Sequence, residues 1–130
     1  MSADAEAPRK KVLIVDDDVP MAGLLQLFFR FEDVDLDLAA TGSEALEKLA
    51  ADDVDLLVLD LMLPEVGGLE IIRELQQRKR SPAILVITSQ AGDATSEERL
   101  RAEPNVAGYF RKPFDQQRFL QAARAILAGR

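Results

Sequence analysis

The sequence predicts an α/β fold in which a parallel five-stranded sheet carries helices on both faces. Three short runs of branched apolar residues are too short for helices and show no polar alternation. Segments with helical periodicity separate them, so strands and helices alternate in the order βαβαβαβαβα. Continuously apolar strands separated by helices are typical of a sheet buried on both faces.

Five strands are expected, and their patterns differ. The three central ones are the apolar runs at 12–15, 56–59 and 84–87. The segment 34–38 alternates apolar residues with aspartates, as a partly wet edge strand does, and 106–110 is short and contains a glycine. Right-handed crossovers with two edge strands favour a doubly wound three-layer sandwich with the strand order 2-1-3-4-5.

The helices are expected where apolar residues share one face of a segment. These faces are Met21, Leu24, Leu25 and Phe28; Ala45, Leu46 and Leu49; Leu69, Ile72 and Leu75; and Phe119, Leu120, Ala123 and Leu127. The stretch 91–104 offers only Leu100 and a few alanines for burial, so we expect a weakly anchored helix there.

Composition limits both the domain organisation and the chemistry. The 130 residues suit one domain, which we expect at 11–130 after a disordered polar leader at 1–10. The absence of Cys and His excludes disulfides, thiolate zinc sites and Ser-His-Asp triads. A net charge of -7 disfavours nucleic acid and favours cationic partners or bound cations. Without an apolar leader or membrane-length segment, the expected location is the cytoplasm.

Polar residues collect at the edge where the carboxyl ends of the expected strands meet, which is where open α/β sheets bind ligands. They are Asp16-Asp17-Asp18, Asp60, Thr88-Ser89 and Lys112. Carboxylates a few ångströms apart repel by about 3–4 kcal/mol per pair at an effective dielectric constant of about 20. Oxygen ligands favour Mg²⁺, and one Mg²⁺ with Lys112 balances the charges of Asp16, Asp17 and Asp60. Such a site suits a transferring phosphoryl group.

Four motifs in order resemble the receiver domain of two-component response regulators. They are Leu13-Ile-Val-Asp-Asp-Asp18, Val58-Leu-Asp-Leu-Met-Leu-Pro-Glu-Val-Gly-Gly68, Leu85-Val-Ile-Thr-Ser89 and Gly108-Tyr-Phe-Arg-Lys-Pro-Phe114. The resemblance covers nearly everything from Lys11 to the C-terminus and implies a flavodoxin-like, CheY-like fold. It also implies a signalling switch that catalyses its own phosphorylation and dephosphorylation and turns over no external metabolite.

The resemblance assigns roles to particular residues. Asp60 would accept a phosphoryl group from a phosphohistidine on a histidine kinase or phosphotransfer protein. Asp16, Asp17, Asp60 and the backbone carbonyl of Met62 would hold Mg²⁺. Lys112 and Thr88 would bind the phosphoryl group, and Tyr109 would turn inward when Thr88 moves. Met62 and Gln90 would control the lifetime of the acyl phosphate. The face formed by the fourth helix, fifth strand and fifth helix would then regulate a partner or form a homodimer.

Several simpler interpretations stay open. Asp18 suits a helix N-cap, and Tyr109 could be an amphipathic rim residue. A Lys112–Pro113 bond in a tight turn can be cis and so aim the lysine inward. Of the aromatics near the end of the first helix, Phe28 suits the core, whereas Phe29 or Leu27 could belong to a kinase-docking patch.

Two features depart from the usual receiver pattern. Glu103-Pro104-Asn105 stands before the fifth strand where most receivers carry Gly-Ala, which suggests a reshaped output face. Gly67 replaces a small polar residue and is expected to make the phosphoacceptor loop more permissive. Two other functions also remain open: a phosphorylation-independent binding module, and a Mg²⁺-dependent phosphohydrolase with Asp60 as its nucleophile.

Overall fold

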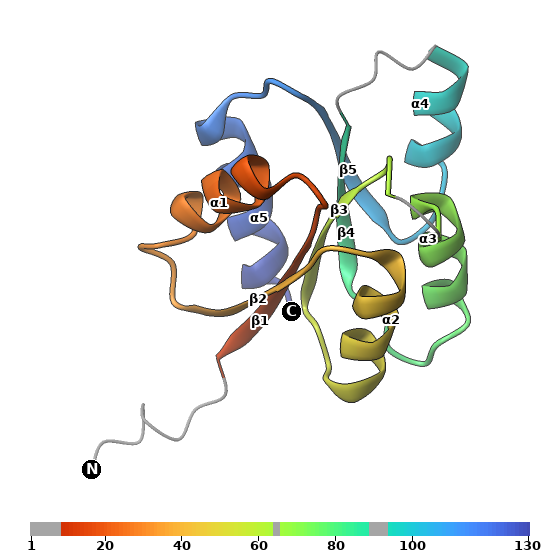
Figure 1. Ribbon diagram of the computed structural model, residues 1–130, viewed down its shortest axis with the longest axis horizontal. Helices are drawn as coiled ribbons and strands as arrows, with labels where there is room; N and C mark the ends of the chain where they lie inside the picture. Colours follow the sequence, from red (N-terminus) through yellow and green to blue (C-terminus); the bar gives the residue numbers. More distant parts are fainter. Residues whose placement is uncertain (1–8, 64–65, 89–93) are drawn as a thin grey trace.

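A computed structural model describes residues 9–63, 66–88 and 94–130, with the side chains of 94–96 excepted. Five strands and five helices alternate along these ranges (Figure 1). The strands are β1 (Lys10–Val15), β2 (Val34–Ala39), β3 (Leu56–Asp60), β4 (Ala83–Thr88) and β5 (Val106–Arg111). The helices are α1 (Val19–Phe28), α2 (Gly42–Ala51), α3 (Gly68–Gln76), α4 (Ala94–Arg101) and α5 (Gln116–Ala128). No helix among the described residues is long and apolar enough to span a bilayer.

The sheet is parallel and has the order β2-β1-β3-β4-β5, which confirms the predicted topology. β1 lies between β2 and β3, with Val12 in register with Leu36 on one side and Leu56 on the other. β1 begins at Lys10, one residue before the predicted start of the domain. Residues 1–8 of that leader lie outside the described ranges.

Two hydrophobic cores form on opposite faces of the sheet. α2, α3 and α4 cover one face, and α1 and α5 cover the other (Figure 1). Side chains of a strand alternate between the faces, so Leu13 and Val15 belong to the first core and Val12 and Ile14 to the second. This two-sided burial explains why the central strands are continuously apolar.

The predicted helix faces are correct for most residues and wrong for two leucines. Leu24 is 42% exposed and Leu69 is 38% exposed. Each leucine is next in sequence to a residue of the buried stripe, and one residue turns a helix by about 100°. The side chains of these leucines therefore lie at the edge of the buried face. The stripe of α3 is instead Gly68, Ile71, Ile72 and Leu75.

Phe29 is buried, which overturns its place in the predicted docking patch. It is only 3% exposed, and its ring meets that of Phe119 edge-on at 5.9 Å between centroids. Phe29 is the C-cap of α1, where the chain leaves the helix, so helical spacing does not describe its direction. Phe28 lies in the core as predicted, and Leu27 is 51% exposed.

The unusual residues before β5 fasten the loop after α4 to α3. The Nε2 of Gln76 donates to Oε2 of Glu103 at 2.7 Å and to Oδ1 of Asn105 at 2.9 Å. The Nδ2 of Asn105 donates to the carbonyl oxygen of Ile72 at 2.9 Å. This departure from the usual pattern therefore forms a polar junction between α3 and the start of β5.

The glycine that the β3–α3 loop requires is Gly68 rather than Gly67. Gly67 has an extended backbone with φ of -70°, which any residue adopts, so the expected permissiveness is not used. A Cβ on Gly68 would lie 3.0 Å from the Cα of Leu61 and 2.9 Å from its side chain. The start of α3 can approach the end of β3 only because residue 68 has no side chain.

Candidate functional site

Asp16, Asp17 and Asp60 form a carboxylate cluster at the carboxyl ends of β1 and β3. Asp60 is the last residue of β3, and Asp16 follows β1 directly. The backbone N–H of Asp16 donates to the carbonyl oxygen of Ala39 at 3.1 Å, which extends the β1–β2 pairing into the site. One oxygen from each carboxylate lies within 4.8 Å of the others. The predicted meeting of these acids is confirmed.

Backbone hydrogen bonds orient the two buried carboxylates. Asp16 and Asp60 are buried, whereas Asp17 is exposed. The backbone N–H of Asp18 donates to Oδ1 of Asp16 at 2.9 Å, and that of Met62 donates to Oδ1 of Asp60 at 3.0 Å. Each Oδ1 is therefore fixed by the chain two residues further on.

Lys112 joins the carboxylates through their other oxygens. Its Nζ lies 3.1 Å from Oδ2 of Asp16 and 3.5 Å from Oδ2 of Asp60. Its side chain is only 12% exposed, and its backbone N–H donates to the carbonyl oxygen of Thr88 at 2.8 Å. The Lys112–Pro113 bond is cis, as the sequence allowed.

Burial and charge shift the pKa values of this pair. Burial raises the pKa of Asp16, and the negative charge of Asp60 raises it further. The hydrogen bonds from Asp18 and Lys112 lower the pKa but do not cancel the rise. Burial lowers the pKa of Lys112, but the hydrogen bond to Asp16 and the charges of Asp60 and Asp16 outweigh it, so the pKa is raised. Lys112 therefore stays an ammonium at neutral pH.

The cluster suits a hard divalent cation. Its ligand atoms are carboxylate oxygens only, which Mg²⁺ prefers to softer donors. One ammonium against three carboxylates leaves the ionised cluster negative, and a divalent cation would complete the balance. Asp17 is exposed to solvent, which leaves room for the water ligands that Mg²⁺ usually keeps.

Thr88 and Tyr109 lie on the face of the sheet that α4 covers. Thr88 is the last residue of β4 and is buried at the same edge as the acids. Tyr109 is 7% exposed and belongs to the core under α4, so the rim interpretation is wrong. The guanidinium carbon of Arg101 lies 5.7 Å from the centre of the Tyr109 ring. The predicted inward movement of Tyr109 remains a prediction.

The remaining predicted residues have different outcomes. Asp18 occupies the N-cap position of α1, but its side chain makes no capping hydrogen bond, so the predicted cap is confirmed only by position. Met62 is exposed, and the roles of its carbonyl and side chain stay predictions. Gln90 and its neighbour Ser89 lie outside the described residues.

Sequence reasoning missed the aromatic residues beneath Lys112. Phe110 and Phe114 stand two positions before and after it, and their rings pack against Phe119. Phe114 is part of the Lys-Pro-Phe motif, so a signal was present. Periodicity could not reveal its contacts, because it lies in the turn between β5 and α5.

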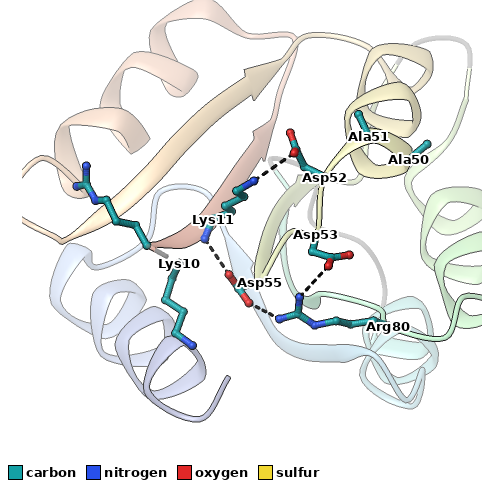
Figure 2. Close-up of a pocket in the computed structure, with 9 residues that line it drawn as sticks. Lys10, Lys11, Ala50, Ala51, Asp52, Asp53, Asp55 and Arg80 are labelled. Carbon is teal, nitrogen blue, oxygen red and sulfur yellow. Dashed lines mark hydrogen bonds and ion pairs between the residues drawn. The ribbon is translucent and has the colours of Figure 1, made fainter. Parts of the chain in front are cut away.

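A pocket of about 520 Å³ lies at the opposite, amino-terminal end of the strands (Figure 2). Its charged residues are largely paired with one another. The Nζ of Lys11 lies 3.1 Å from Oδ1 of Asp52, and an Nη2–Oδ1 pair joins Arg80 to Asp55 at 2.6 Å. Asp55 also accepts from the backbone N–H of Lys11 at 2.8 Å. These pairs join α2, β1 and β3, so we place the functional site at the acid cluster.

Comparison with known proteins decides the family. Residues 12–124 match the family model described as the response regulator receiver domain. The chain belongs to the response regulator receiver family. It is therefore the receiver domain of a response regulator in two-component signalling, and phosphorylation and Mg²⁺ binding are typical of such domains.

Three curated relatives carry names of this family's regulators. The receiver is 36% identical to "Response regulator ArlR" of Staphylococcus saprophyticus, over 90% of this chain and 52% of the relative. It is 37% identical to "Response regulator MprA" of Mycobacterium ulcerans, over 90% and 50%. It is 36% identical to "Alkaline phosphatase synthesis transcriptional regulatory protein PhoP" of Bacillus subtilis, over 91% and 48%. The chain thus spans about half the length of these relatives.

Solved receiver structures share the fold. A signal receiver domain of an HD domain-containing protein from Pseudomonas fluorescens superposes with a TM-score of 0.85 at 26% identity, covering 95% of this chain and 90% of the other. A CheY-like response regulator receiver domain protein from Methanospirillum hungatei gives 0.81 at 26% identity, covering 93% and 95%. These likenesses agree with the order of strands and helices in this receiver.

Proposed function

We propose that Asp60 accepts a phosphoryl group from a phosphohistidine of a histidine kinase or phosphotransfer protein. The observation that carries this proposal is the position of Lys112, whose ammonium lies between Asp16 and Asp60 in a largely buried site. A cation held at a buried carboxylate is placed to stabilise charge on a transferring phosphoryl group. Thr88 lies at the same edge and supplies a hydroxyl donor.

The transfer exchanges one bond of phosphorus for another. A carboxylate oxygen of Asp60 forms a P–O bond while the P–N bond of the phosphohistidine breaks, and the imidazole leaves with the electron pair of that bond. Lys112 and Thr88 bind two of the phosphoryl oxygens as the acyl phosphate forms. Asp16, Asp17, Asp60 and the carbonyl of Met62 would hold Mg²⁺, which would supply positive charge beside the phosphoryl oxygens.

The output follows from a shift between two arrangements of the α4, β5 and α5 face. A phosphoryl group that binds Thr88 and Lys112 better in one arrangement increases the population of that arrangement. Thr88 lies on the face of β4 that packs into the same core as Tyr109 and α4. Movement of Thr88 can therefore alter the packing of Tyr109 and α4. The changed face would regulate a partner protein or form a homodimer.

We assign the donor contact to the exposed side of α1. Leu27 is exposed there, and Leu24 and Phe31 are exposed close to it in the chain. Such side chains suit the apolar face of a partner's helix. The proposed role is that of a cytoplasmic switch whose only chemistry is its own phosphorylation and dephosphorylation.

The decisive experiment measures phosphoryl uptake from acetyl phosphate with and without Mg²⁺. Intact-mass spectrometry should show one adduct of about 80 Da on the wild-type protein with Mg²⁺. Asp60→Asn should abolish it. Asp52→Asn makes the same charge change at the opposite edge and should leave uptake unchanged.

Three results would overturn the proposal. The first is a wild-type protein that gains no adduct with Mg²⁺. The second is an Asp60→Asn variant labelled as well as the wild type. The third is steady release of phosphate from small phosphoesters through Asp60, which would support a phosphohydrolase instead.

A further inference from the structure

Five phenylalanine rings form one cluster beneath the turn that carries Lys112. Phe119 of α5 lies at its centre, with ring centroids 5.2 to 6.1 Å from the other four. Those four are Phe28 and Phe29 at the end of α1, Phe110 of β5, and Phe114. Phe119 is completely buried, so this cluster is a fixed part of the core under α1 and α5.

The cluster anchors the chain on both sides of Lys112. Phe110 and Phe114 pack against each other at 5.8 Å between centroids. Both also pack against Phe119, at 5.5 and 5.2 Å. Phe114 further meets Phe28 edge-on at 6.3 Å, which connects the turn to α1. Offset and edge-on pairs of this kind attract each other beyond what their buried area alone provides.

Phe114 supports the turn on the side where proline follows Lys112. The backbone N–H of Lys112 donates to the carbonyl oxygen of Thr88, which fixes the chain that enters the turn. Pro113 has no N–H to donate, so the following side lacks the next backbone bond. Phe114 is partly buried and is the first residue beyond Lys112 whose side chain packs against the core.

We infer that Phe114 is a positioning residue for phosphoryl transfer, holding the turn so that the Lys112 ammonium stays beside Asp16 and Asp60. The ring of Phe114 touches no reacting atom and acts only through Lys112. This inference rests on the proposed function, because it needs Lys112 to bind the phosphoryl group.

The test compares three variants with the wild type at saturating Mg²⁺, using acetyl phosphate as donor. Phe114→Ala removes the ring, Phe114→Leu keeps apolar bulk, and Phe29→Leu alters another ring of the same cluster that lies away from the turn. Misplacement of about 1 Å can cost up to about 100-fold in rate. We expect Phe114→Ala to slow uptake about tenfold, Phe114→Leu less than about threefold, and Phe29→Leu hardly at all.

Two further readouts separate positioning from loss of structure. The Mg²⁺ dissociation constant, measured by calorimetry, should not rise in Phe114→Ala, because the carboxylates come from other strands and a displaced ammonium leaves the cluster more negative. In a Lys112→Met background, Phe114→Ala should cause no further slowing, since it acts through the missing ammonium. Urea unfolding establishes that each variant is folded under the assay conditions.

The outcomes distinguish this inference from the function on which it rests. If wild-type Asp60 takes up no phosphoryl group, both are overturned. If the wild type is labelled but Phe114→Ala reacts as fast as Phe29→Leu, only the positioning role is overturned. Equal slowing by Phe114→Ala with and without Lys112 would also overturn it. Should Phe114→Ala fail to fold, the same comparisons are made with Phe114→Leu. That variant should slow uptake by a smaller but reproducible factor, and the slowing should vanish in the Lys112→Met background.

Discussion

The Nζ atom of Lys112 lies 3.1 Å from Oδ2 of Asp16, although 96 residues separate them in the chain. Burial and the neighbouring charge of Asp60 raise the pKa of Asp16. Lys112 therefore offsets a repulsion that the fold itself creates between the ends of β1 and β3. The stability of the metal-free protein depends on the Lys112 ammonium more strongly than it would if the carboxylates were exposed to solvent.

Replacing Lys112 with methionine should weaken the metal-free protein and strengthen Mg²⁺ binding. Loss of the charged hydrogen bond is expected to lower the free energy of unfolding by about 1–3 kcal/mol. The more negative cluster should then bind Mg²⁺ more tightly than the wild type does. Urea unfolding with and without Mg²⁺, together with calorimetric titration, measures both effects. Weaker Mg²⁺ binding in Lys112→Met would contradict this account of the charges.

Asp17 is expected to contribute to Mg²⁺ binding but little to the stability of the folded protein. Its side chain is exposed, so Asp17→Asn should leave the metal-free stability nearly unchanged. Loss of one carboxylate ligand should reduce Mg²⁺ affinity about tenfold, which corresponds to about 1.4 kcal/mol. Asp18→Asn is the matched control, because it makes the same change one residue away outside the cluster. Equal affinities for Asp17→Asn and the wild type would remove Asp17 from the proposed ligands.

Glu32 and Arg124 should make stability depend on pH. Two hydrogen bonds, Nε–Oε1 at 3.0 Å and Nη2–Oε2 at 2.8 Å, connect the loop after α1 to α5. The hydrogen bond from Arg124 lowers the pKa of Glu32, so the ionised form stabilises the folded protein. That contribution is complete above the ordinary glutamate pKa of about 4.3 and disappears as the pH falls through the lowered value.

The measurement for this pair is chemical unfolding of Glu32→Gln and the wild type across the acid range. The variant should be less stable than the wild type at pH 7, and the two should converge in strong acid. Glu47→Gln alters an exposed glutamate of α2 and should track the wild type throughout. A deficit in Glu32→Gln that persists unchanged in strong acid would show that packing, rather than charge, is responsible.

Phe119 should be among the costliest residues to truncate. It is fully buried and contacts four other rings, so Phe119→Ala is expected to lower the free energy of unfolding by about 3–5 kcal/mol. Phe31 is 83% exposed, and Phe31→Ala should change the free energy of unfolding by less than about 0.5 kcal/mol. Urea denaturation gives both values. Similar costs for the two variants would mean that the aromatic cluster does not stabilise the protein.

The sequence was sufficient for the sheet and for the cluster of acids, because both depend on strong local patterns. Apolar runs such as 84–87 identify buried strands, and parallel strands bring their carboxyl ends together whatever the loops do. Asp16, Asp60 and Lys112 could therefore be placed at one edge. The resemblance to receivers supplied the particular roles of these residues, which pattern alone does not give.

The errors occur where local geometry departs from the regular repeat. Phe29 follows the last residue of α1, so its direction depends on how the chain leaves the helix. Asp18 holds the N-cap position, but its side chain makes no capping bond there. The junction of Gln76 with Glu103 and Asn105 joins segments far apart in the sequence, and no periodicity reports such a contact.

The sheet separates α1 from α4, with one core on each side. Phe28 of α1 belongs to one core, whereas Leu100 of α4 belongs to the other together with Tyr109. With the donor contact on α1 as proposed, the selectivity of donor recognition and that of the α4 part of the output face can therefore diverge by separate mutations during evolution. An engineer could likewise exchange residues on one helix to connect this protein to a new sensor while leaving its response intact.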